Sequence, residues 1–220
     1  MSRGLTTLLT LLAMLAFAGN SLLCRLALQD TAIDAASFTS VRIASGGLVL
    51  WLIVRWRGGG LRYAGTWPSA VALFIYAAGF SYAYIGLTAA VGALLLFGAV
   101  QATMIGYGLW HGERLAPRQW LGLVLALAGL VGLLLPGLSA PPLRAASLML
   151  LAGVAWGVYS LRGAGAGDPT AVTAGNFVRA TPLALLLSLV TIPWLRLDNA
   201  GLGYAAASGA LTSGLGYAVW

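Results

Sequence analysis

Two arginines stand alone inside long apolar runs of this chain, and their side chains are suited to anion recognition. Arg42 and Arg179 lie 137 positions apart, each roughly eight to ten residues into its run. A charged side chain at the centre of a bilayer costs about 2.5–3.5 kcal/mol on insertion scales. One interpretation is that one or both guanidinium groups face an aqueous cavity and attract a carboxylate. The alternative is structural: hydrogen bonds to backbone carbonyls, or a side chain that reaches the headgroups.

Uncharged polar side chains occur in the same runs and are further candidates for solute contact. Asn20 and Tyr159 occupy matching places in two similar segments and each is followed by serine, while Gln101 is a lone amide in another run. Tyr82 and Tyr217 also occupy matching places, and their rings could stack on a solute. The alternative for the amides is a hydrogen bond between helices, worth about 0.6–2 kcal/mol.

Groups for acid–base or metal chemistry are scarce. The chain has one histidine, one cysteine (Cys24) and five acids. His111 and Glu113 are adjacent to a run end, but no second histidine or cysteine pair supports a metal site. Gly163–Gly167 follows no predicted strand, which argues against a nucleotide-binding loop. We therefore predict no metal, no cofactor and no enzyme activity.

The composition indicates a membrane protein. Hydrophobic residues make up 60% of the chain and charged residues 8%, whereas a soluble domain has about 25% charged residues. The runs reach the roughly 20 residues that a membrane helix needs and do not alternate as barrel strands do. The net charge of +7 comes from arginines, mostly at run ends, which favours a role in membrane orientation over nucleic-acid binding. The predicted partners are the lipid bilayer and a small-molecule substrate; the oligomeric state is left open.

The predicted fold is an all-α, polytopic membrane helix bundle. Prolines and glycines at 136–142 divide a first unit, residues 1–137, from a second, residues 143–220. Five helices are expected in the first unit and three in the second, at about 5–28, 35–54, 69–87, 91–110, 119–135, 144–161, 170–192 and from 204 onward. An alternative for the first run is a cleaved signal peptide ending near Ala16-Phe17-Ala18. The run continues to Leu28, so we favour its retention as a helix.

Three matching segments indicate a duplication. Ala16–Leu22 matches Ala155–Leu161 at an offset of 139, Arg42 matches Arg179 at 137, and Phe80–Ala83 matches Leu215–Ala218 at 135. An odd number of helices in the first unit makes the second enter the membrane from the opposite face. The chain is therefore expected to hold two inverted repeats, an arrangement in which transporters place their solute site near the bilayer midplane.

The arginines predict the orientation. With a cytoplasmic N-terminus, the outer side receives three of them and the inner side seven, and cytoplasmic loops normally carry the excess. The outer three are Arg25, Arg144 and Arg196; the inner seven are Arg3, Arg55, Arg57, Arg62, Arg114, Arg118 and Arg162. We predict a multi-pass protein of the inner cell membrane.

Several motifs carry a family resemblance. Trp110-His111-Gly112-Glu113-Arg114-Leu115, followed by Gln119, Gly122 and Ala128-Gly129, resembles the junction between helices 4 and 5 of EamA-type proteins in the drug/metabolite transporter superfamily. Gly19-Asn20-Ser21 is similar to that family's Trp-Gly-Ser-Asn element, and Arg42 falls where the family has an arginine. The resemblance implies ten helices in two inverted units of five, and export of small metabolites such as amino acids or drug-like compounds by alternating access.

The second unit is expected to be incomplete, because Trp220 aligns near Ile85 of the first unit. The last two of the ten helices implied by the resemblance would then be missing. One rival is therefore a truncated, non-transporting membrane subunit. A second rival, an intramembrane enzyme, is disfavoured because the acids and the histidine lie near run ends.

Overall fold

The computed structural model describes residues 3–61, 64–134, 141–165 and 167–219, and every regular element in those ranges is helical. The predicted all-α class is confirmed. Arg62, Trp220 and most of the predicted divider at 136–142 lie outside the described residues. The elements are α1 (Arg3–Asp30), α2 (Ala35–Trp56), α3 (Trp67–Tyr84), α4 (Ala89–Trp110), α5 (Pro117–Leu134), α6 (Leu143–Gly163), α7 (Pro169–Val190), the 3-10 turn η1 (Ile192–Trp194), α8 (Asn199–Ala207), the π-helix η2 (Ser208–Leu215) and α9 (Gly216–Val219).

Five described helices, namely α1, α2, α4, α6 and α7, are long and apolar enough to cross a membrane. The 22 residues of α2, for example, span about 33 Å at 1.5 Å per residue, which matches a hydrocarbon core of about 30 Å. The chain is therefore a multi-pass membrane helix bundle by its length and composition. Crossing by α3, by α5 and by the continuous segment 199–219 stays a prediction.

Helix ends are set by side-chain caps, which explains where the observed bounds differ from the predicted ones. The expected helix 69–87 ends at Tyr84, because the chain turns at Ile85 and Gly86 and Thr88 then caps α4. The last helical segment begins at Asn199 rather than near 204, because the Asp198 carboxylate accepts the N–H of Gly201 at 3.1 Å. Such caps satisfy N–H groups that the first helical turn leaves free.

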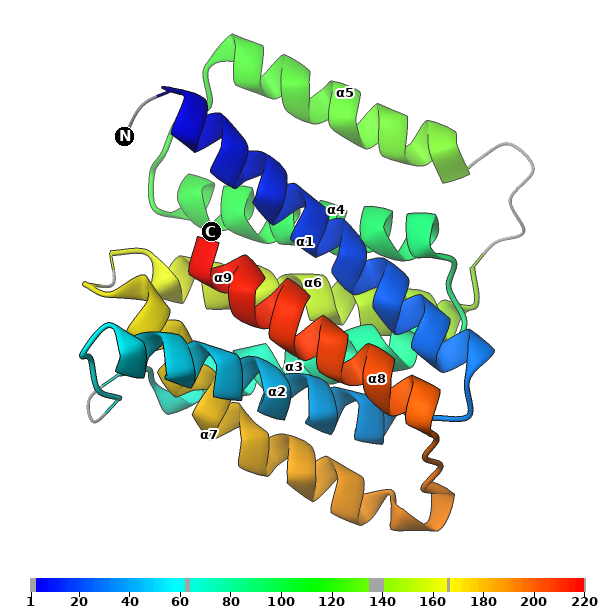
Figure 1. The fold of residues 1–220 in the computed structure, drawn as a ribbon. Helices are drawn as coiled ribbons and strands as arrows, with labels where there is room; N and C mark the ends of the chain where they lie inside the picture. Colours follow the sequence, from blue (N-terminus) through cyan, green and yellow to red (C-terminus); the bar gives the residue numbers. More distant parts are fainter. Residues whose placement is uncertain (1–2, 62–63, 135–140, 166, 220) are drawn as a thin grey trace.

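The helices pack side by side, with their long axes roughly along one direction (Figure 1). α3 lies along α6, α2 along α7, and the segment 199–219 along α1 and α2, while α4 covers another face of α6. α5 occupies the outer edge of the bundle, next to α4 (Figure 1). The buried core therefore lies between α1, α2, α3, α6, α7 and the segment 199–219.

α2 and α7 are antiparallel partners, and α7 lies at an outer edge of the bundle (Figure 1). Ser40 Oγ, near the start of α2, donates to the carbonyl of Ala184 near the end of α7 at 2.7 Å. Beyond the end of α2, Arg57 Nη1 donates to Thr170 Oγ1 at the start of α7, at 3.4 Å. The two ends of the bundle can thus be named by their turns. The α6–α7 end holds the end of α2 and the start of α3, and the α1–α2 end holds the end of α3 and the start of α8.

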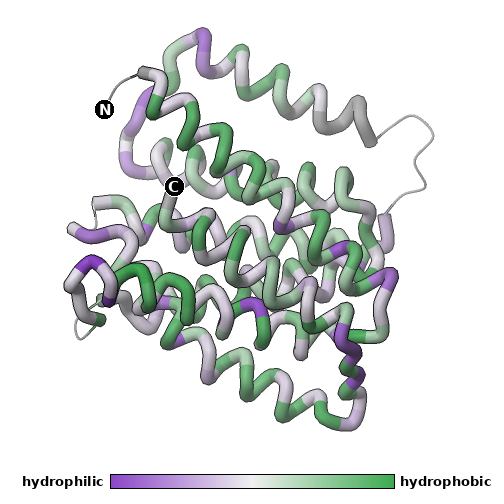
Figure 2. Tube along the Cα trace, in the orientation of Figure 1, coloured by the Kyte–Doolittle hydropathy of each residue, from purple (hydrophilic) through white to green (hydrophobic). Residues whose placement is uncertain are grey.

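Most strongly hydrophilic residues lie at those two ends, and the lengths of the helices are mainly apolar with a few hydrophilic positions among them (Figure 2). Asp34, Asp168 and Asp198 are the N-caps of α2, α7 and α8. Asp34 also accepts the backbone N–H of Arg196 at 3.0 Å, which fastens two turns together at the α1–α2 end. Most of the acidic groups are therefore engaged at helix termini, away from the middle of the bundle.

Candidate functional site

A buried asparagine joins four helical segments in the middle of the bundle. Asn20 of α1, 6% exposed, accepts hydrogen bonds at Oδ1 from Ser208 Oγ at 2.8 Å and from Thr212 Oγ1 at 3.2 Å. Arg42 Nη1 of α2 lies 3.5 Å from the same oxygen. The Asn20 amide nitrogen donates to the hydroxyl of Tyr76 on α3 at 3.2 Å. These five residues are called the polar centre below.

The polar centre lies midway along α3. Tyr76 is nine residues after the start of α3 and eight before its end, about 12–14 Å from either terminus at 1.5 Å per residue. Polar groups at that depth have no water to bond with and are costly unless they are satisfied within the protein or line a cavity. Their grouping around one amide oxygen therefore lets these buried polar groups satisfy one another.

The π-helix η2 supplies two of the five members. Its wider turn is uncommon and occurs often at functional sites. Thr212 Oγ1 donates back to the carbonyl of Ser208 at 2.6 Å as well as reaching Asn20. Gly209 packs so closely on α2 that a Cβ there would lie about 2 Å from Ser45 Oγ. The absence of a side chain at Gly209 thus lets η2 approach Arg42 and Asn20.

Arg42 is almost completely buried, at 2% exposed, and its described partners are neutral. Its guanidinium carbon lies 5.5 Å from the ring centroid of Tyr76 and 4.9 Å from that of Phe80. Cation–π contacts of this kind contribute about 0.5–2 kcal/mol. The chain's acidic groups are at helix ends or in turns, so the arginine lacks a carboxylate among its contacts.

Trp156 of α6 extends the polar centre into an aromatic layer. Its ring stacks on Tyr76 with centroids 5.2 Å apart and an interplanar angle of 27°, and it meets Phe17 edge-on at 5.3 Å. The side chain is 5% exposed. Its Nε1–H is buried and lies near the Tyr217 hydroxyl, without the geometry of a full hydrogen bond. A buried donor that is only partly satisfied is uncommon in folded proteins.

A pocket of about 290 Å³, with several polar side chains in its wall, opens beside this layer at the α6–α7 end. Tyr159 of α6 and Tyr217 of α9 lie edge to face in its wall, with ring centroids 6.3 Å apart. Asn176 of α7 donates to the Tyr159 hydroxyl at 3.5 Å and accepts the backbone N–H of Thr66 at 2.9 Å. Tyr159 is one helical turn from Trp156. The α6–α7 pocket is lined by Met104, Tyr159, Thr173, Asn176, Tyr217 and neighbouring turn residues.

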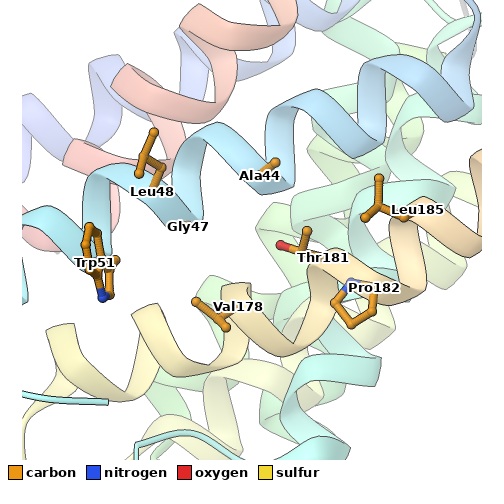
Figure 3. Close-up of a pocket in the computed structure, with 8 residues that line it drawn as sticks. All are labelled: Ala44, Gly47, Leu48, Trp51, Val178, Thr181, Pro182 and Leu185. Atoms are coloured by element: carbon orange, nitrogen blue, oxygen red, sulfur yellow. The ribbon is translucent and has the colours of Figure 1, made fainter.

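The other clefts are apolar and lie at the flanks of the bundle. Figure 3 shows a groove of about 440 Å³ between α2 and α7, with Gly47 and Trp51 on one side and Val178 and Pro182 on the other. A cleft of about 520 Å³ separates α1 from α4, and one of about 430 Å³ separates α4 from α5. Their linings are those of surfaces that contact lipid or other helices.

Four of the seven predicted site residues are in or beside the centre, and three are elsewhere. Asn20 and Arg42 belong to the polar centre, and Tyr159 and Tyr217 to the α6–α7 pocket. Arg179 bonds the backbone carbonyls of Ala64 and Gly175, which is the structural alternative for a buried arginine. Gln101 is exposed in the cleft between α4 and α5, and Tyr82 is partly exposed on α3, away from Asn20. Contact of Arg179, Gln101 and Tyr82 with a solute stays a prediction.

Sequence reasoning missed Ser208, Thr212, Asn176 and Trp156 as site residues and ranked Tyr76 below Tyr82. The signal for Ser208 and Thr212 was their spacing of four in an otherwise small and apolar segment. Trp156 was noted only as part of the repeat. The searched residues contain no group of three or more histidine, cysteine, aspartate or glutamate side chains that could hold a metal ion.

Two comparisons with known proteins bear on the chain, and no family model matches it. It is 62% identical over 216 residues to the uncharacterized protein PA1977 of Pseudomonas aeruginosa, covering 98% of this chain and 75% of that protein. A crystal structure of a protein with 24% identity superposes with a TM-score of 0.70, covering 96% of this chain and 77% of the other. That likeness supports the fold of the bundle alone.

Proposed function

The chain belongs to the family that includes the Pseudomonas aeruginosa protein PA1977, and we propose that it is a membrane transporter of small organic solutes. The observation that carries the proposal is the polar centre, buried at mid-depth of an otherwise apolar bundle and adjoined by a pocket that reaches one end. Intramembrane polar groups of this kind mark solute pathways. The EamA-like motifs of the sequence support the same class and, with it, export from the cytoplasm.

The pairing of the helices supports an inverted repeat. If the two units were related by a two-fold axis in the membrane plane, α2 and α7 would pair with each other, antiparallel. α3 would then pack on α6 as the segment 199–219 packs on α1. The observed contacts follow that scheme. Inverted units are the basis of alternating access, in which one unit rocks against the other around a fixed site.

The two ends of the bundle differ in a way that suits such a cycle. The α6–α7 pocket leads inward from one end to Tyr159 and Tyr217. At the opposite end, Gln29 of α1 donates to the carbonyls of Tyr84 and Ile85, and Asp34 holds the backbone of Arg196. Hydrogen-bonded turns thus close the α1–α2 end while the other end is hollowed. This is the asymmetry expected of a transporter open toward one side.

The chemistry of the polar centre favours recognition over catalysis. Its described members are an amide, three hydroxyl groups and an arginine, which bind and orient but are poorly suited to donate or remove protons near neutral pH. His111 lies far along α4, where its Nδ1 contacts the carbonyl of Tyr107 at 2.9 Å. A transport role requires these groups only to bind the solute, and hydrogen bonding is sufficient for that.

The test is transport by purified protein in liposomes. The 220-residue chain would be reconstituted into liposomes. The liposomes would be loaded with unlabelled solute, and exchange would be measured with radiolabelled amino acids, organic acids and aromatic compounds. We expect at least one solute to exchange well above empty liposomes. Asn20→Ala should reduce that exchange at least tenfold, whereas Leu189→Ala, at an exposed apolar site on α7, should leave it unchanged. Exchange no faster than in empty liposomes across the panel, or equal rates in both variants, would contradict the proposal.

A further inference from the structure

The polar centre holds more hydrogen-bond donors than acceptors. Asn20 Oδ1 is shared by Ser208, Thr212 and Arg42, and the third of these contacts is long, at 3.5 Å. Guanidinium carries five N–H donors and no acceptor. The Trp156 Nε1–H is buried nearby, and its described neighbour, the Tyr217 hydroxyl, does not meet the geometry of a full hydrogen bond. The centre is therefore cationic and short of acceptors.

The half-buried Arg179 shows how the same chain satisfies a guanidinium when only structure is needed. Arg179 donates through Nη1 to two backbone carbonyls, those of Ala64 and Gly175. Arg42 has instead one long contact to a shared amide oxygen and two aromatic rings against it. The guanidinium carbon thus lies over two rings, and its remaining described polar neighbour is the Tyr76 hydroxyl.

We propose that the polar centre binds the carboxylate of the transported solute, with Arg42 as the charge partner and Trp156 Nε1–H as a second donor. This inference rests on the proposed transport function and names its substrate class. A carboxylate is planar, carries one negative charge and accepts two parallel N–H bonds from the edge of an arginine. A doubly charged phosphate would leave one negative charge unbalanced at this depth, because Arg42 is the charged member of the centre.

The α6–α7 pocket provides the approach and holds the remainder of the solute. Its volume of about 290 Å³ is at the lower limit of small-molecule sites, which are commonly about 300–1,000 Å³. Tyr159, Thr173 and Asn176 present neutral polar groups in its wall. Tyr217 lines this pocket and Trp156 stacks on Tyr76 of the polar centre, so we expect both side chains to shift when the carboxylate is admitted. The structure thus assigns a monocarboxylate with a small, neutral body.

The test compares acids with their amides. Acetate, L-lactate, benzoate and N-acetyl-L-leucine, each against its primary amide, would be titrated calorimetrically into the purified full chain. At least one acid should bind tenfold or more tightly than its amide. Arg42→Gln should abolish that preference. Arg57→Gln, which removes one positive charge at the exposed α6–α7 end, should change affinities less than twofold.

Asn20→Asp provides a variant that should fold and yet lose binding. The new carboxylate would have nearly the same shape, lie 3.5 Å from Arg42 Nη1 and take the place of the solute's anion. We expect an unchanged or higher unfolding temperature together with at least a tenfold loss of acid affinity. Undiminished acid binding by this variant or by Arg42→Gln would overturn the proposal, as would equal affinity for acids and amides. Equal competition by sodium chloride would assign an inorganic anion instead and overturn it too.

The outcomes separate this inference from the transport function. Exchange of neutral solutes that persists in Arg42→Gln would leave the transporter standing and remove the carboxylate assignment. Selective, Arg42-dependent binding of an acid without exchange in liposomes would keep the site and remove transport.

Discussion

Asn20 is the residue on which the polar centre depends, because one amide oxygen accepts three hydrogen bonds. A leucine of similar size would leave Ser208 and Arg42 without this acceptor, whereas the Thr212 hydroxyl would keep the carbonyl of Ser208. Each buried group that loses its partner costs about 1–3 kcal/mol. We therefore expect Asn20→Leu to lower the free energy of unfolding by at least about 2 kcal/mol, measured by denaturant titration in micelles.

Gln101→Leu is the matched control for that substitution. It also replaces an amide with leucine in a helix, but Gln101 is exposed beside the apolar cleft between α4 and α5. Substitutions at such sites stay within about 0.5 kcal/mol of neutral. Similar losses in the two variants would show that the hydrogen bonds of Asn20 do not contribute specially to stability.

At the residue scale, the sequence could identify which polar groups are unusual but not which of them meet. Arg42 and Arg179 look alike in composition and depth, and the first lies in the polar centre while the second binds carbonyls. The difference arises because the backbone of Ala64 and Gly65 passes next to α7, where it offers a carbonyl to Arg179. Loop paths of that kind are not encoded in hydropathy. The joining of Asn20 to Ser208 across 188 positions is equally invisible to local patterns.

At the scale of elements, close approach between helices depends on small residues at the contact. A Cβ at Gly153 of α6 would lie 2.5 Å from the Cβ of Ala99 and 2.6 Å from the carbonyl oxygen of Leu96, both on α4. Neither atom belongs to a long side chain that could rotate away. Small residues at such crossings let membrane helices pack by van der Waals contact where no hydrophobic force drives them together.

Gly153→Val should therefore push α4 away from α6. Overpacking of this kind costs about 1–3 kcal/mol, and we expect an unfolding midpoint in micelles that is lower by a corresponding amount. Gly106→Val, on α4 with open space around its position, controls for the change in helix propensity from glycine to valine. Equal destabilisation by the two variants would contradict the packing argument.

The helices themselves could be predicted well, and their irregularities could not. Long apolar runs give all the long helices to within a few residues, because the bilayer and backbone hydrogen bonding leave little choice. The π-helix at 208–215 was missed, because its wider turns are stabilised by packing of Gly209 on α2 and by hydroxyl contacts to Asn20. A helical repeat read from the sequence assumes 3.6 residues per turn throughout. The irregular element is thus the one that supplies Ser208 and Thr212 to the centre.

At the scale of the whole molecule, the bundle has two chemically distinct ends. The described arginines outside the middle of the bundle are concentrated at the α6–α7 end, where they include Arg55, Arg57, Arg114, Arg118 and Arg162. Arg144 and Arg196 lie at the α1–α2 end. Arg162 Nε donates to Ser69 Oγ at 3.1 Å and Arg57 contacts Thr170, so arginines from both units are held at one end by contacts with a neighbouring helix.

This distribution gives a prediction about topology. Cytoplasmic loops carry the excess of arginine, so the α6–α7 end should face the cytoplasm. Single cysteines would be placed at the exposed positions Arg57 and Ala164 of that end, and at Ile85 and Leu197 of the other. An impermeant maleimide applied to intact cells should label Ile85→Cys and Leu197→Cys. It should reach Arg57→Cys and Ala164→Cys only after the membrane is permeabilised.

The native Cys24 is fully buried and provides the background for this measurement, because a thiol inside the bundle should stay unlabelled in both conditions. The positions were chosen so that each end is sampled once from each predicted unit. Labelling of Arg57→Cys and Ala164→Cys from different sides of the membrane would contradict the bundle described above, because these two positions would then lie at opposite ends of it. If Arg57→Cys and Ala164→Cys were labelled in intact cells, and Ile85→Cys and Leu197→Cys only after permeabilisation, the bundle would stand and its orientation would be reversed. The solute pocket would then open to the outside, and this conformation would be the outward-facing state of the transport cycle.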